Sequence, residues 1–134
     1  MNQTSGTGPG EAPQRRKILI VDDDRDTREM LMLALDLEGY DVEQAANGLR
    51  LVSSLRVDRP DLILLDVMMS WIDGFELCRS IKKNEELRDI PIVFVSARKG
   101  GEDVRRGLEA GAADYFTKPV DIDLLNARIR ELLG

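Results

Sequence analysis

Ile18-Leu-Ile-Val-Asp-Asp-Asp24 and Leu62-Ile-Leu-Leu-Asp66 are the stretches that decide the fold, since each is a short apolar run that ends in acid. A third run, Pro91-Ile-Val-Phe-Val-Ser96, has the same form and ends in a hydroxyl. Runs that are apolar at every position are typical of parallel strands that helices cover on both faces. The sequence therefore indicates a buried parallel sheet with polar residues where its strands end.

Strand and helix patterns alternate along the rest of the chain. Strands are predicted at 17–21, around Val42, and at 61–65, 91–95 and 113–117, and helices at 25–38, 48–57, 74–84, 102–110 and 121–133. Within 102–110, Val104 and Leu108 are expected to face inward. Five such units predict an α/β fold with a doubly wound five-stranded parallel sheet, flavodoxin-like in its order 2-1-3-4-5, and five helices.

Length and composition allow one domain. Residues 1–16 are rich in Gly, Pro, Ser and Thr and are predicted to be a disordered N-terminal tail, which leaves residues 17–134 as the domain. Lys and Arg total 19 and Asp and Glu total 25, a net charge of −6 that argues against nucleic-acid binding by this domain. No apolar run is long enough for a membrane span, and no signal peptide is visible, so a cytoplasmic protein is expected.

Two residue counts restrict the chemistry. Histidine is absent, so a phosphohistidine, if one takes part, must belong to a partner. Cys78 is the only cysteine, which excludes an internal disulfide, and its apolar neighbours on one helical face predict core packing.

Polar side chains gather at the expected carboxyl edge of the sheet, namely Asp22, Asp23, Asp66, Ser96 and Lys118. Each of them taken singly could be a helix cap or a solvated loop end. Three carboxylates within roughly 5 Å of one another would repel by about 3 kcal/mol per pair at an effective dielectric near 20. Oxygen ligands without His or Cys suit Mg²⁺. A carboxylate, a cation, a hydroxyl and an ammonium are the parts that make and hold an aspartyl phosphate.

These stretches, together with Asp73-Gly74, Ile90-Pro-Ile-Val-Phe-Val-Ser-Ala97 and Gly111-Ala-Ala-Asp-Tyr-Phe-Thr-Lys-Pro119, closely resemble bacterial two-component response-regulator receiver domains. The resemblance covers residues 17–133 in order. It implies that Asp66 is the phosphoacceptor, that Asp23 binds Mg²⁺ directly, and that Asp22 holds the waters of that ion. The main-chain carbonyl of Met68 is implied as the third protein ligand.

Further roles come from the same resemblance. Ser96 matches the hydroxyl that moves to the phosphoryl group, and Lys118 the lysine that pairs with a phosphoryl oxygen. Tyr115 matches the aromatic switch residue. The Lys118–Pro119 bond matches one that is typically cis.

The implied function is that of a phosphoacceptor signalling switch in a two-component phosphorelay. Asp66 would take its phosphoryl group from a histidine kinase or a histidine phosphotransfer protein, with Mg²⁺ as cofactor. The surface made by the fourth helix, fifth strand and fifth helix would then change, for an output domain or effector to read. Such a domain is no enzyme towards other substrates, because it catalyses only its own phosphorylation and dephosphorylation.

Two other classes of protein share part of this pattern, namely phosphatases and inactive pseudo-receivers. Phosphatases of the haloacid-dehalogenase class need a second acid at the position of Met68, and inactive adaptor pseudo-receivers usually lose one of the site residues.

Relatives that dimerise use charges like those of Asp114 and Arg128, but Leu124 stands where they often have an acid. A monomer or a weak dimer is therefore expected.

Two features are particular to this chain. Ser70 replaces the proline that receivers usually carry four residues after the acceptor, which predicts a looser loop and a partly exposed Trp71. The first predicted helix is apolar nearly all round, from Met30 to Leu37. It is either covered by neighbouring loops or a docking patch for the phosphodonor protein.

Overall fold

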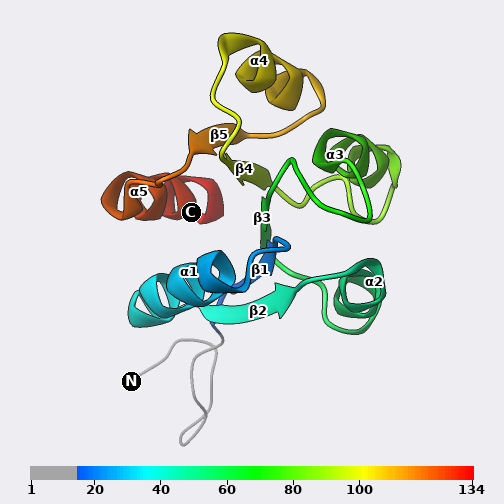
Figure 1. Cartoon of the computed structure of the whole chain (residues 1–134). Coiled ribbons are helices and arrows are strands. Elements are labelled where there is room, and N and C mark those ends of the chain that lie inside the picture. The colour runs from blue at the N-terminus through cyan, green and yellow to red at the C-terminus, as the bar shows by residue number, and fades with distance from the viewer. Residues whose placement is uncertain (1–14) are drawn as a thin grey trace, which may run out of the picture.

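Five parallel strands form one sheet in the computed structural model of the protein, which describes residues 15–134 (Figure 1). The order across the sheet is β2-β1-β3-β4-β5, as predicted. The strands are β1 (Lys17–Val21), β2 (Asp41–Ala45), β3 (Leu62–Leu65), β4 (Ile92–Ser96) and β5 (Asp114–Thr117). The helices are α1 (Arg25–Leu37), α2 (Gly48–Val57), α3 (Gly74–Lys83), α4 (Gly101–Glu109) and α5 (Ile122–Leu133). Of the predicted tail, residues 1–14 lie outside the described part, and Arg16 already accepts a hydrogen bond from the Asp41 amide at its carbonyl.

The three fully apolar runs form the centre of the sheet. Every residue of β1, β3 and β4 is buried, whereas β2 and β5 at the two edges are partly exposed. This difference follows from position, since only central strands have neighbours on both sides and helices on both faces.

Helices cover the sheet in two layers, with α1 and α5 on one face and α2 and α3 on the other (Figure 1). Leu31 and Leu35 of α1 pack with Leu125 and Ile129 of α5 in one apolar cluster. The other cluster holds side chains of α2 and α3, and α4 packs on the same face through Gly107 against Phe94. The sheet therefore separates two cores.

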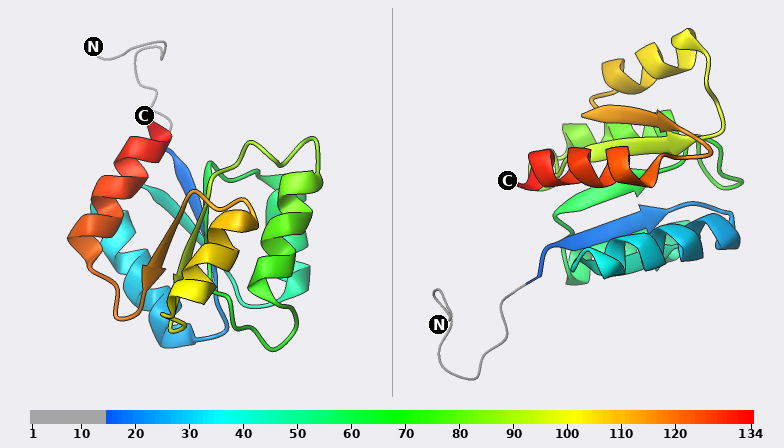
Figure 2. Two further views of the ribbon diagram at one scale, coloured as in Figure 1. Left: turned by 90° about the horizontal axis from the view of Figure 1, so that it is seen from above. Right: turned by 90° about the vertical axis from the view of Figure 1, so that its left-hand side faces the viewer.

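The register of the strands determines which residues leave the sheet together. Val21 pairs with Leu65, so the next residues, Asp22 and Asp66, emerge side by side. Ser96 pairs with Thr117, which places Lys118 next to the end of β4. All strand ends point the same way (Figure 2), and the carboxyl edge collects the polar residues as the sequence predicted.

Helix α4 differs from its prediction in one respect. Leu108, expected to face inward, is 47% exposed, and the buried residue of α4 is Gly107. A Cβ on Gly107 would lie 2.9 Å from the Tyr115 ring and 3.0 Å from the Phe94 ring. The helix can approach the sheet this closely only through a glycine, and this rotates Leu108 outward.

Two other predictions are confirmed. Cys78 is fully buried, and burial raises the pKa of its thiol to about 11. The Lys118–Pro119 peptide bond is cis.

Among residues 15–134, the helices are all too short or too polar to pass through a lipid bilayer.

Candidate functional site

Three charged side chains meet where β1, β3 and β5 end. The Lys118 ammonium donates to Asp22 Oδ2 at 2.9 Å and to Asp66 Oδ2 at 3.4 Å. The carboxylates are almost entirely buried, with 4% of the Asp22 side chain and 9% of the Asp66 side chain exposed. Asp22, Asp66 and Lys118 are thus brought together as predicted.

Burial and charge act on this group in opposite directions. Burial raises the pKa of Asp22 above its ordinary value, although the Asp24 amide and Lys118 partly counteract it. Burial by itself would lower the pKa of Lys118, but hydrogen bonds and charge from Asp22 and Asp66 outweigh it and leave that pKa raised. The site therefore holds a protonated Lys118 ammonium against two buried carboxylates.

Asp23 has a different hydrogen-bond partner from Asp22 and Asp66. Its Oδ2 accepts a hydrogen bond from the Ser70 amide at 2.6 Å, and the residue is exposed. Within residues 15–134, no three acidic, histidine or cysteine side chains lie close enough together to hold a metal ion. Asp22 and Asp66 share the Lys118 ammonium, whereas Asp23 binds the Ser70 amide. A common metal site of the three carboxylates stays a prediction.

The donor types nevertheless fit a hard cation. Asp22, Asp23 and Asp66 offer carboxylate oxygens at one edge, and across the described chain no donor reaches the Met68 carbonyl. Oxygen ligands of this kind are those that Mg²⁺ prefers. An ion bound here would draw on these four residues.

Ser96 and Tyr115 belong to neighbouring strands, β4 and β5. Ser96 is fully buried, and its hydroxyl accepts a hydrogen bond from the Arg98 amide at 3.2 Å. The Tyr115 hydroxyl donates to the Arg98 carbonyl, its ring lies 5.7 Å from that of Phe94, and burial raises its pKa. The loop through Arg98 therefore connects both predicted switch residues.

Two contributors to the acidic loop were not predicted from the sequence. The Arg28 guanidinium donates to the carbonyls of Asp22 at 2.7 Å and Asp23 at 3.1 Å. Asp24 caps α1, because its carboxylate accepts from the Thr27 amide at 3.0 Å. Side-chain donors to main-chain carbonyls leave no periodic signal, and only the Asp-x-x-Thr spacing at the helix start indicated the cap.

The loop after Asp66 is held by close packing and by an indole. A Cβ on Gly74 would lie 2.2 Å from the Asp66 carbonyl oxygen, so the start of α3 presses directly on the acceptor's main chain. Trp71 is partly exposed, as predicted, and its Nε1 donates to the Ala46 carbonyl at 3.1 Å. The indole also covers Gly48. These contacts anchor the loop after Ser70. The looseness of the loop that is expected from the missing proline stays a prediction.

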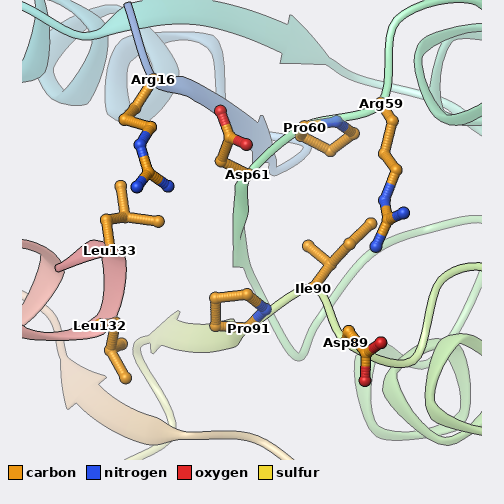
Figure 3. Close-up of a pocket in the computed structure, with 9 residues that line it drawn as sticks. All are labelled: Arg16, Arg59, Pro60, Asp61, Asp89, Ile90, Pro91, Leu132 and Leu133. Carbon is orange, nitrogen blue, oxygen red and sulfur yellow. The ribbon is translucent and has the colours of Figure 1, made fainter.

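Two hollows differ in their relation to this edge. One, of about 470 Å³, opens beside the acceptor loop and is lined by Val67, Met68, Met69, Ser70, Asp73 and Arg98. The other, of about 370 Å³, lies at the opposite edge, where β1, β3 and β4 begin. Figure 3 shows Arg16 and Leu133 on one side of it and Arg59 on the other. Only the first of these two hollows is lined by the residues that follow Asp66 in the chain.

The predicted dimer charges are paired within the chain. Arg128 Nε donates to Asp114 Oδ2 at 2.9 Å, and Leu124 nearby on α5 is 60% exposed. The oligomeric state itself stays a prediction.

Known proteins resemble this chain over nearly its whole length. The family model of the response regulator receiver domain matches residues 18–130. Response regulator MprA of Mycobacterium avium is 44% identical over 117 residues, which are 87% of this chain and 50% of that protein. DNA-binding dual master transcriptional regulator RpaA of Synechocystis is 38% identical over 87% of this chain and 48% of its own length. The chain thus spans about half the length of these curated relatives.

Solved structures agree with the fold. The signal receiver domain of a signal transduction histidine kinase from Syntrophus aciditrophicus has a TM-score of 0.80 at 40% identity, over 88% of this chain and 89% of that one. The signal receiver domain of a DNA-binding response regulator from Colwellia psychrerythraea has a TM-score of 0.84 at 29% identity, over 88% and 98%. Given the strand order, the buried Asp66–Lys118 pair and these matches, the chain belongs to the response regulator receiver domain family.

Proposed function

We propose that this receiver domain is a Mg²⁺-dependent phosphoacceptor switch that takes a phosphoryl group on Asp66 from the phosphohistidine of a partner. The observation that carries the proposal is the buried Asp66 carboxylate with the Lys118 ammonium 3.4 Å away. A buried carboxylate beside a fixed cation, and next to an open hollow, is suited to meet an anionic phosphoryl donor.

The transfer requires few groups. An Asp66 oxygen attacks the phosphorus, the P–O bond forms as the P–N bond to the partner's imidazole breaks, and the imidazole takes its proton from solvent. Lys118 pairs with a phosphoryl oxygen, and Ser96 turns its hydroxyl toward another. Mg²⁺, when held by Asp23, Asp66 and the Met68 carbonyl, with Asp22 on its waters, supplies charge neutralisation.

The switch would then reach the outer surface through the loop at Arg98. Both Ser96 and Tyr115 bond to that residue's main chain, so movement of the Ser96 hydroxyl releases one of its contacts. Tyr115 packs on Gly107 of α4, which ties the change to the surface of α4, β5 and α5.

Helix α1 supports docking by a histidine kinase or a histidine phosphotransfer protein. Met30, Leu33 and Leu37 form one stripe on the helix and are 42%, 68% and 85% exposed. Exposed apolar stripes of this kind suit a partner helix. The alternative, a helix covered by neighbouring loops, has little support among residues 15–134, because the stripe stays open.

An output domain is proposed from the relatives. They are about twice as long as this chain, and one of them is described as a DNA-binding transcriptional regulator. We infer that the receiver controls such a domain in the full protein, while this acidic domain does not itself bind nucleic acid.

Phosphorylation tests the proposal. Incubation with acetyl phosphate and Mg²⁺ should add one phosphoryl group, detected by intact-mass spectrometry. Asp66→Asn should remove it, chelation of Mg²⁺ should prevent it, and Asp58→Asn, at the end of α2 and beside the start of β1, should leave it unchanged. Equal labelling of wild type and Asp66→Asn would exclude this acceptor.

A further inference from the structure

The Ser70 amide occupies one carboxylate oxygen of Asp23, the residue proposed as the direct Mg²⁺ ligand. We infer that this amide restrains Asp23 in a resting position and thereby weakens Mg²⁺ binding, so that Ser70 sets the Mg²⁺ concentration at which the receiver becomes competent. The inference rests on the proposed function and concerns one main-chain hydrogen bond.

The hydrogen bond is short and has no competitor. Ser70 N lies 2.6 Å from Asp23 Oδ2, and no other donor in residues 15–134 reaches this carboxylate. Hydrogen bonds to ionised acceptors are among the stronger ones in proteins. Asp22 and Asp66, in contrast, both bind Lys118. The one acid without the ammonium is therefore the one on Ser70.

This geometry makes the amide and the metal rivals. In the described part of the chain, Asp23 is not grouped with Asp22 and Asp66 closely enough to hold an ion. The Ser70 amide occupies Asp23 Oδ2, so a cation that takes this oxygen displaces the amide. Metal binding therefore has to offset the loss of this hydrogen bond.

The amide is presented by an anchored loop. The Trp71 indole donates to the Ala46 carbonyl at 3.1 Å, and the Gly74 amide donates to the Val67 carbonyl at 2.8 Å. Both anchors are independent of Asp23. The Ser70 N–H therefore need not be ordered afresh each time Asp23 returns to it, which favours the resting position.

A proline at this position would remove the rival, because proline has no N–H. Ser70→Ala is the matched control, since it removes the hydroxyl and keeps the amide. In calorimetric Mg²⁺ titrations of the whole chain, Ser70→Pro should bind roughly three- to tenfold more tightly than wild type, the factor that one net hydrogen bond contributes. Ser70→Ala should match wild type.

A measurement on the wild-type chain covers the case in which Ser70→Pro distorts the loop. The Ser70 amide proton should resonate downfield in the absence of metal, and it should move upfield during a Mg²⁺ titration, with the same midpoint as the calorimetric curve. An amide signal that does not respond to saturating Mg²⁺ would overturn the inference, whatever the proline variant does.

The possible failures are distinguishable. If wild type and both variants bind Mg²⁺ with equal affinity and the Ser70 signal is static, the rivalry is refuted and the proposed function stands. If none of the three binds Mg²⁺, the metal-dependent function itself is refuted, and the inference with it.

Discussion

Gly74→Ala should be the most damaging single-methyl change near the acceptor. The added Cβ would lie 2.2 Å from the Asp66 carbonyl oxygen and 2.7 Å from Val67 Cα. Both neighbours are main-chain atoms, so no side-chain rotation can relieve the clash. Either α3 moves away or the acceptor segment is displaced.

The magnitude follows from what must move. Cβ atoms in proteins essentially never lie closer than 3.0 Å to such a neighbour. To reach that distance, the main chain of a buried segment must shift by close to an ångström. Overpacking of this kind costs about 3 kcal/mol, the upper end of the usual range, because the backbone itself must shift. For a domain of this size the melting temperature should fall by about 10 °C.

Urea unfolding measured by circular dichroism gives the free energy directly. The matched control is Gly101→Ala at the start of α4, where a Cβ would meet nothing within 4 Å. That variant should be neutral or up to about 1 kcal/mol more stable, since alanine favours helix. If Gly74→Ala lost no more stability than Gly101→Ala, the reasoning from main-chain contact would be refuted.

Three further predictions concern other contacts. Gly107→Ala should displace the Tyr115 ring, whose Cδ2 lies 2.9 Å from the added methyl, and should alter the near-ultraviolet dichroism of that tyrosine; an unchanged spectrum would contradict the close packing. Trp71→Phe removes the indole N–H that donates to the Ala46 carbonyl, and the free energy of unfolding in urea should fall by about 1 kcal/mol. A variant as stable as wild type would show that this hydrogen bond is dispensable. The Cys78 thiol has a folded pKa of about 11 against an ordinary 9, so the unfolded chain ionises first, and stability should fall as the pH rises from 9 to 11. Cys78→Ala should lose that part of the alkaline slope in urea titrations, and a slope equal to that of wild type would exclude the thiol as its source.

The central sheet could be predicted because three separate runs of the sequence show the same apolar pattern. In β1, β3 and β4 every residue except Lys17 at the start of β1 is apolar or ends its run, and the burial of all these residues leaves few other arrangements. The polar ends of these strands then meet at one edge by the geometry of parallel strands. Fold, strand order and the pairing of Asp66 with Lys118 follow from that pattern.

The remaining details depend on contacts that a pattern does not encode. Asp23 binds a main-chain amide, and every residue except proline carries one, so residue type could not reveal the partner. Leu108 was assigned inward by helical spacing, but the closeness of the Phe94 and Tyr115 rings admits only Gly107. Both contacts depend on distances between elements of the fold, which the periodicity along a single element does not encode.

The two cores have a consequence for how this domain can diversify. The buried residues of α1 belong to one apolar cluster, whereas Phe94 and Tyr115, which contact α4, belong to the other. The sheet separates the two clusters. Substitutions that reshape one layer therefore need no compensating change in the other, since distant sites act nearly additively. Under the proposed function, recognition of the phosphodonor through α1 and signalling through α4 can therefore vary separately, whereas α5, which packs with α1, is shared by both.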